Sequence, residues 1–133
     1  MDFIKISHEI LAIDSSMRYV EIMGRDGELL LNKMKQEKYS VKAQRKEELL
    51  SLDLYNAKQM EKKFNKTLGN VAFTHVFRTK VHQLVWYHDD CIIYCTCEGD
   101  NDNSKIIEIL RKIETVLGIS KPIELSNFFE IPN

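Results

Sequence analysis

The sequence predicts an α+β fold in which an antiparallel sheet is flanked by helices. Two observations indicate this class. Apolar residues recur at three- and four-residue spacing near both ends of the chain, as on the buried stripe of a helix. Between these stretches lie segments rich in β-branched and aromatic residues, most of them joined by short polar turns. With 133 residues, 44% of them apolar, the chain can bury one core, so we expect one domain over residues 1–118 and a tail over residues 119–133.

The N-terminal part of the chain predicts a helix followed by a hairpin. The helix, over residues 2–13, has one apolar stripe formed by Phe3, Ile6, Ile10 and Ile13. It ends in a short polar turn, because such side chains compete for backbone hydrogen bonds. Two strands follow at residues 19–23 and 28–32, and the Asp26-Gly27 pair between them tolerates the positive φ of a tight turn.

A long helix and three strands are predicted for the middle of the chain. Residues 40–68 carry apolar residues at helical spacing up to Gly69, which suits the left-handed position that ends many helices. Two short helices with a break near residues 51–53 are the alternative, because this stretch is long for a small domain. The pattern then changes to β, and three antiparallel strands are expected at residues 71–77, 81–88 and 91–97.

The last helix is predicted between a turn-rich loop at residues 99–104 and Gly118. Its apolar stripe is formed by Ile106, Leu110, Ile113 and Leu117. The complete order is α-β-β-α-β-β-β-α, which gives a five-stranded antiparallel sheet with helices on its faces.

Four short motifs accompany this element order, which covers residues 2–118: Ile10-Leu11-Ala12-Ile13-Asp14, Arg18-Tyr19-Val20, Asp26-Gly27 and Ser104-Lys105-Ile106-Ile107. The order resembles the roadblock and longin type of profilin-like domain. The motifs resemble a family of small archaeal proteins, chiefly from ammonia-oxidising Thaumarchaeota, known as a domain of unknown function. Ser15 departs from that family, which has proline there. The resemblance implies that the first and last helices cover one sheet face and the middle helix the other, in a regulatory or scaffolding module that is commonly dimeric and has no catalytic residue.

The sequence contains none of the short motifs that mark common catalytic or cofactor sites. It has no Gly-x-Ser-x-Gly, no glycine-rich phosphate loop, no His-Glu-x-x-His and no Cys-x-x-Cys. Its five glycines are not gathered in a loop that could cradle a phosphate. We therefore expect a protein that is not an enzyme and holds no cofactor or metal.

Three cysteines carry the most distinctive side chains of the predicted sheet. Cys91, Cys95 and Cys97 have the same parity, so their thiols share one face of a strand with Ile93. Cys95 and Cys97 lie about 7 Å apart along that strand, whereas zinc sites take closely spaced ligands from a turn. We favour packing in the core, because free cysteine behaves as a small apolar residue; a metal or redox role is the alternative.

The same thiols and the termini predict the compartment. Three is an odd number, so a closed disulfide framework cannot form, and free thiols fit the reducing cytoplasm. The N-terminus lacks the pattern of a signal peptide, and the longest apolar run, Cys91 to Cys95, is too short for a membrane span. We expect a cytoplasmic protein without membrane contact.

An aromatic set offers a second class of function, small-molecule sensing. Phe73, His75 and Phe77 share a strand face, and with Trp86 they are expected to line a pocket between the sheet and the middle helix. His75 is interpreted first as a buried, hydrogen-bonded histidine and second as a ligand or catalytic group.

Charge is unevenly distributed along the chain, although the net charge is only −1. Residues 33–66 contain ten Lys and Arg against five Asp and Glu, a local +5 that leaves −6 for the remainder. These cations are interpreted either as a solvated helix face or as an interaction surface, formed by Lys42, Arg45, Lys46, Lys58, Lys62 and Lys63. Few aromatic residues interleave with them, so we do not expect nucleic-acid binding.

The predicted tail over residues 119–133 is too apolar for a solvated segment. It carries Ile123, Leu125, Phe128, Phe129 and Ile131. We expect it to pack over the domain or against a partner subunit, with Phe128 and Phe129 as anchors. The sequence thus favours an interaction module, expected to be a homodimer with an unidentified protein partner, over a small-molecule sensor.

Overall fold

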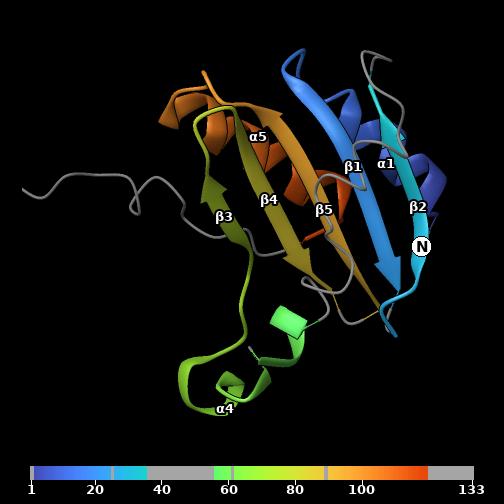
Figure 1. The fold of residues 1–133 in the computed structure, drawn as a ribbon, viewed down its shortest axis with the longest axis vertical. Coiled ribbons are helices and arrows are strands. Elements are labelled where there is room, and N and C mark those ends of the chain that lie inside the picture. The colour runs from blue at the N-terminus through green and yellow to red at the C-terminus, as the bar shows by residue number, and fades with distance from the viewer. Residues whose placement is uncertain (1, 25, 36–55, 61, 89, 120–133) are drawn as a thin grey trace, which may run out of the picture.

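Five antiparallel strands with helices on one face form the described part of the molecule (Figure 1). The structure, a computed structural model, describes residues 2–24, 26–35, 56–60, 62–88 and 90–119. The elements are α1 (Phe3–Leu11), β1 (Met17–Gly24), β2 (Leu29–Met34), α4 (Asn65–Leu68), β3 (Thr74–Phe77), β4 (Val81–Tyr87), β5 (Cys91–Glu98) and α5 (Asn103–Val116). Residues 56–60 are helical as well.

The strand order across the sheet is β2-β1-β5-β4-β3, with every neighbouring pair antiparallel. The predicted α+β class and five-stranded antiparallel sheet are therefore confirmed. A bulge lies in β1, where Met17 pairs with Cys97 and Tyr19 with Thr96, so Arg18 has no counterpart on β5. The extra residue shifts the alternation, and Met17 therefore faces the same core as Val20.

Helices α1 and α5 cover one face of the sheet, as the resemblance implies (Figure 1). Each helix begins at an aspartate whose carboxylate accepts a backbone N–H of the first turn: Asp2 from Lys5 at 3.1 Å and Asp102 from Lys105 at 2.8 Å. Their apolar stripes pack on alternate residues of the central strands. The core on this face includes Ile6, Ile10, Val20, Ile22, Leu84, Ile93, Ile106, Leu110 and Ile113.

The C-terminus of α5 has the geometry of a Schellman motif. Gly118 has φ 72°, and its N–H donates to Thr115 O at 3.1 Å. The N–H of Ile119 reaches back to Glu114 O at 3.0 Å. The predicted helix end at Gly118 is confirmed, and the chain turns back toward the last turn of α5.

The predicted long helix over residues 40–68 lies partly outside the described residues. Within them, residues 56–60 and α4 are helical, and a turn at Lys63 and Phe64 separates the two. Gly69 has φ 83° but ψ 167°, so α4 ends in an extended turn and not in the left-handed cap that the sequence predicts. Strand β3 begins at Thr74 instead of residue 71, because its ladder to β4 starts only with the pair of Thr74 and Val85.

A close approach of two backbones joins the turn between β3 and β4 to the exit of β5. The N–H of Gly99 donates to Lys80 O at 3.1 Å. A Cβ atom on Gly99 would lie 2.7 Å from Thr79 O and 2.7 Å from the carbonyl carbon of Lys80. Only glycine fits here without moving the backbone.

None of the described helices is long and apolar enough to cross a membrane.

Candidate functional site

The three cysteines lie on the helix-covered face, with Ile93, as their parity predicts. All are buried and free. Burial raises the pKa of the Cys91 and Cys97 thiols to about 11 and that of Cys95 further still, so the thiols stay protonated at neutral pH. Within the described ranges, no three His, Cys, Asp or Glu side chains are close enough together to hold a metal ion.

His75 lies in a pair of histidines. Its Nε2 is 2.9 Å from Nδ1 of His82, and Nε2 of His82 is 3.3 Å from the carbonyl oxygen of Asn101. Since a carbonyl only accepts, Nε2 of His82 donates to it, and the contact between the two rings is one hydrogen bond whose direction follows from their tautomers. Burial, and next the neighbouring His82, lower the pKa of His75. The edge of Phe77 meets the His82 ring with centroids 4.5 Å apart, so these side chains form one cluster at the end of β3.

Phe73 and Trp86 lie apart from that cluster, at a cavity of about 300 Å³. Their rings stack with centroids 5.5 Å apart. The predicted aromatic set is therefore split, with only Phe73 and Trp86 at the cavity. Glu114 and Leu117 from the end of α5 form the helical wall, where the sequence predicts the middle helix. Alternation along β3 could not reveal this, because it does not tell which helix covers a sheet face.

A second, smaller hollow of about 90 Å³ adjoins this cavity. The two share four lining residues, Asn70, Val71, Tyr87 and His88. Lys58 and Lys62 line only the smaller hollow. The two hollows are therefore adjacent, and we call them together the α5-end groove: its larger part has apolar walls at Phe73 and Trp86, and its smaller part carries the two lysines.

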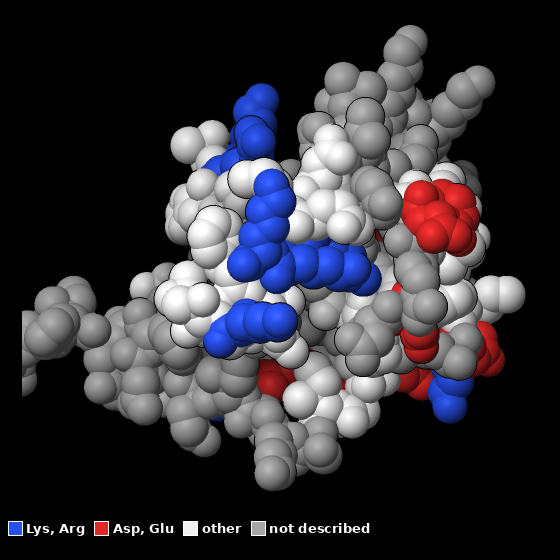
Figure 2. Space-filling model, turned by 90° about the horizontal axis from the view of Figure 1, so that it is seen from below, with Lys and Arg blue, Asp and Glu red and all other residues white. Residues whose placement is uncertain are grey.

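Three large apolar side chains are exposed on the two helical segments and the turn between them. Met60, Phe64 and Leu68, spaced four apart, are 57%, 55% and 78% exposed. The neighbouring lysines Lys62, Lys63 and Lys66 are also exposed. Figure 2 views the end of the molecule where α4 lies and shows Lys and Arg gathered on one side and Asp and Glu on another. We call Met60, Phe64, Leu68 and these lysines the interaction stripe.

The cationic surface predicted from the sequence is only partly described. Lys62 and Lys63 are exposed as expected, whereas Lys58 is buried, because its ammonium donates to the carbonyl oxygen of His88 at 2.7 Å. The other predicted members lie outside the described residues: Lys42, Arg45, Lys46, Phe128 and Phe129.

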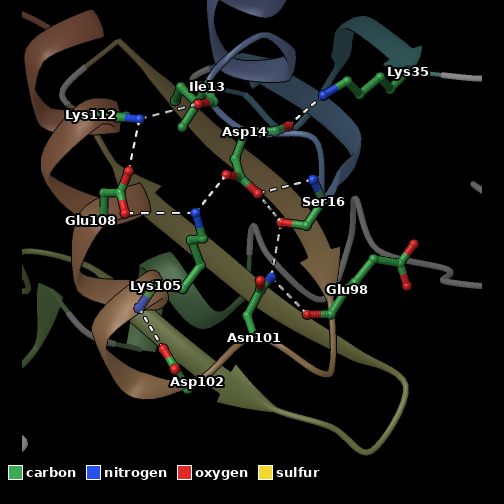
Figure 3. A network of polar contacts seen from close by, with 10 residues as sticks. All are labelled: Ile13, Asp14, Ser16, Lys35, Glu98, Asn101, Asp102, Lys105, Glu108 and Lys112. Atoms are coloured by element: carbon green, nitrogen blue, oxygen red, sulfur yellow. Dashed lines mark hydrogen bonds and ion pairs between the residues drawn. The ribbon is translucent and has the colours of Figure 1, made fainter.

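A network of polar side chains joins α1, β1 and α5 around Asp14 (Figure 3). The Asp14 carboxylate accepts from the Ser16 hydroxyl at 2.5 Å and the Ser16 N–H at 3.0 Å, and Lys105 Nζ lies 3.0 Å away. These groups, Ser16 first, hold the pKa of Asp14 well below its usual range. Asn101 Nδ2 donates to the Ser16 hydroxyl at 3.0 Å and so links the loop before α5.

This network is suited to fixing structure, since its carboxylate stays ionised and its hydrogen-bond partners are occupied. From the sequence, the polar residues Asp14, Ser15 and Ser16 predict a turn that ends the first helix, but no network. The Asp-x-Ser spacing, which suits a side chain that bonds the backbone two residues on, was the available signal.

No protein-family model matches the sequence, and no curated protein is similar to it. Solved structures do share its fold. The gliding protein MglB from Thermus thermophilus gives a TM-score of 0.65 at 13% identity over 88% of this chain and 87% of that chain. MglB from Myxococcus xanthus gives 0.63 at 10% identity, over 88% and 94%. A roadblock/LC7 domain from Streptomyces avermitilis gives 0.59 at 8% identity, over 89% and 95%. At these identities the likeness shows the fold alone, which is of the roadblock type that the element order predicts.

Proposed function

We propose that the protein is a non-enzymatic regulatory or scaffolding module that binds other proteins and forms a homodimer. The interaction stripe is the observation that carries this proposal. Three large apolar side chains, four residues apart in the sequence, stay more than half exposed, and exposed apolar patches mark protein contacts. The lysines beside them add a preference for an acidic surface.

The shared fold supports self-association, since a solved MglB is described with a tetrameric arrangement. A second copy of this chain also offers acidic surface, because the sequence outside residues 33–66 carries a charge of −6. The contact would then combine an apolar centre with complementary charge, as protein interfaces commonly do.

Oligomeric state measured on the full chain tests this proposal. We expect sedimentation equilibrium to show a dimer, and Phe64→Ser with Leu68→Ser to weaken its association by at least tenfold, because both remove apolar contact area. Ile4→Ser is the matched control, since Ile4 is 64% exposed on α1, away from the stripe. A wild-type chain that stays monomeric, and captures no protein from the native host cytosol, would contradict the proposal.

The cavity beside Phe73 and Trp86 favours a second candidate, a small-molecule sensor. Its volume of about 300 Å³ is at the low end of the range of ligand pockets, roughly 300–1,000 Å³. A rise in melting temperature with a small aromatic compound, lost in Phe73→Ala, would support this function.

We propose further that the protein is cytoplasmic and belongs to the small archaeal family. The odd number of free thiols supports a cytoplasmic location, and the four motifs support membership in the small archaeal family. We also propose one domain over residues 1–118 and a tail over residues 119–133 that packs on the domain or on a partner subunit.

A further inference from the structure

We propose that the α5-end groove is the docking site of the chain's own tail, residues 120–133, which packs against Phe73 and Trp86 of the same molecule. This proposal takes one of the two arrangements of the tail given above. The groove shares Lys62 with the interaction stripe but none of the stripe's apolar residues, so either proposal can fail without the other.

The groove has two chemically different parts. One part is apolar, with Phe73 and Trp86 as a stacked pair and Leu117 and Ile119 opposite. The other part carries Lys62, which is exposed and makes no ion pair within the described part of the chain. A complementary occupant is therefore apolar along most of its length and bears a carboxylate.

The tail has this composition. Five of its residues are large and apolar, two of them adjacent phenylalanines, and its charged residues are Lys121, Glu124 and Glu130. The glutamates lie between apolar residues, so an apolar anchor and a carboxylate can be presented together. A cavity of about 300 Å³ is large enough for aromatic side chains such as Phe128 or Phe129.

The end of α5 directs the chain to this groove. The Schellman motif at Gly118 turns the backbone so that Ile119 lies beside the last turn of α5. Ile119 is itself a lining residue of the cavity, so the tail leaves the helix at the mouth of its proposed site.

Chain length favours docking within one molecule over docking on a second copy. From Ile119 to Phe128 an extended chain spans about 30 Å, which leaves room for a turn back into the groove. A short tether gives an effective concentration on the order of millimolar, well above ordinary protein concentrations. The tail of the same molecule therefore competes best for the site.

The single tryptophan of the chain makes this proposal measurable. Trp86 lines the cavity and gives one indole N–H resonance in a ¹H–¹⁵N spectrum. In the full chain carrying Phe128→Ser and Phe129→Ser, we expect this resonance to move from its wild-type position. A peptide of residues 120–133, titrated into that variant, should return it toward the wild-type position, whereas the same peptide should leave the wild-type chain unchanged.

Two alanines provide a matched pair of variants. Ala72 lines the groove and is exposed, so Ala72→Phe fills the site at little risk to folding. Added to the serine variant, it should weaken peptide binding at least tenfold. Ala12 is exposed at the end of α1, away from the groove, and Ala12→Phe should change binding less than twofold.

Three results would overturn the proposal. The serine substitutions could leave the indole resonance in place, or Ala72→Phe could leave peptide binding intact. The third is a wild-type indole resonance that shifts on about a hundredfold dilution. The last result would assign the tail to a second copy, because docking within one molecule is independent of concentration. Phe64→Ser separates this test from the dimer test, since it should weaken the dimer without moving the indole resonance.

Discussion

The two faces of the central strands β1 and β5 are both buried but have different chemistry. Under α1 and α5 the central strands present aliphatic and thiol side chains such as Ile22, Ile93 and Cys95. The alternate positions of the same strands carry tyrosines and polar groups, including Glu21 and Thr96, which are 1% and 0% exposed. On this second face the Tyr19 hydroxyl donates to Glu21 at 3.0 Å, and Gln83 donates to the Tyr94 hydroxyl at 2.8 Å.

This difference shows how the register of the sheet is specified. A slip of β1 against β5 by one residue would exchange the faces. Glu21 would then enter an aliphatic core, and Ile22 would meet the tyrosines. Burying a carboxylate without partners costs several kcal/mol, so the polar face excludes registers that the apolar face alone would allow. Substitutions on the two faces and at their rims should therefore change stability by different amounts.

The largest effect is expected from cavities made at neighbouring positions on opposite faces. Ile93→Ala should lower the free energy of unfolding by about 3–4 kcal/mol, because two packed helices keep the site from collapsing. Ile92→Ala, equally buried on the other face, should cost about 2 kcal/mol. Urea unfolding of both variants measures this difference. If Ile92→Ala lowers the free energy of unfolding as much as Ile93→Ala, the two faces do not differ in how they respond to a cavity.

The next effect concerns the rim of the helix-covered face, where Asp14 holds its polar network. Asp14→Asn should cost about 2 kcal/mol at neutral pH, because charge-assisted hydrogen bonds to Ser16 and Lys105 are weakened. The pKa of Asp14 is lowered in the folded state, so this stability is present above about pH 4 and is lost as the pH falls. The free energies of unfolding of the wild type and the variant should therefore become equal at low pH. A constant difference down to about pH 2 would show that the charge is not responsible.

A third effect has the opposite sign and belongs to the polar face. The Thr96 hydroxyl is buried and has no hydrogen-bond partner among the described residues. Thr96→Val keeps the shape and removes this hydroxyl, so it should raise the free energy of unfolding by about 1 kcal/mol. Thr115→Val, on the exposed side of α5, is the control and should not stabilise the protein. Destabilisation by Thr96→Val in thermal and urea unfolding would indicate that the hydroxyl has a partner.

The smallest effect is a pH dependence at the edge of the helix-covered face. The pKa of His75 is lowered when the protein folds, so the unfolded chain binds more protons in mild acid. The free energy of unfolding should not depend on the protonation of His75 above about pH 6.5, and it should decrease as the pH falls below this value. His75→Gln should reduce this slope between about pH 7.5 and 5.5 in urea unfolding. An unchanged slope would assign the dependence to another group.

The sheet and the terminal helices could be predicted because their signals are local. The β-branched and aromatic residues of Cys91–Glu98 and the aspartate before α5 are visible within a few residues. The bulge at Arg18 and the late start of β3 could not be predicted, since both depend on which residues of a neighbouring strand supply hydrogen bonds.

The candidate sites were less predictable than the fold. The shared face of the cysteines follows from parity, but the partners of Asp14 come from residues up to 91 positions away. The α5-end groove likewise joins segments that no short motif connects, from Lys58 to Ile119. Sequence patterns show which face a side chain occupies, and tertiary packing decides what it meets there.

Gly99 offers a way to recognise distant relatives of this chain. Side-chain chemistry in the core can drift while volume is kept, but the space beside the backbone of Thr79 and Lys80 admits no Cβ. Any descendant that retains this crossing must retain the glycine, followed three residues later by the helix-capping position of Asp102.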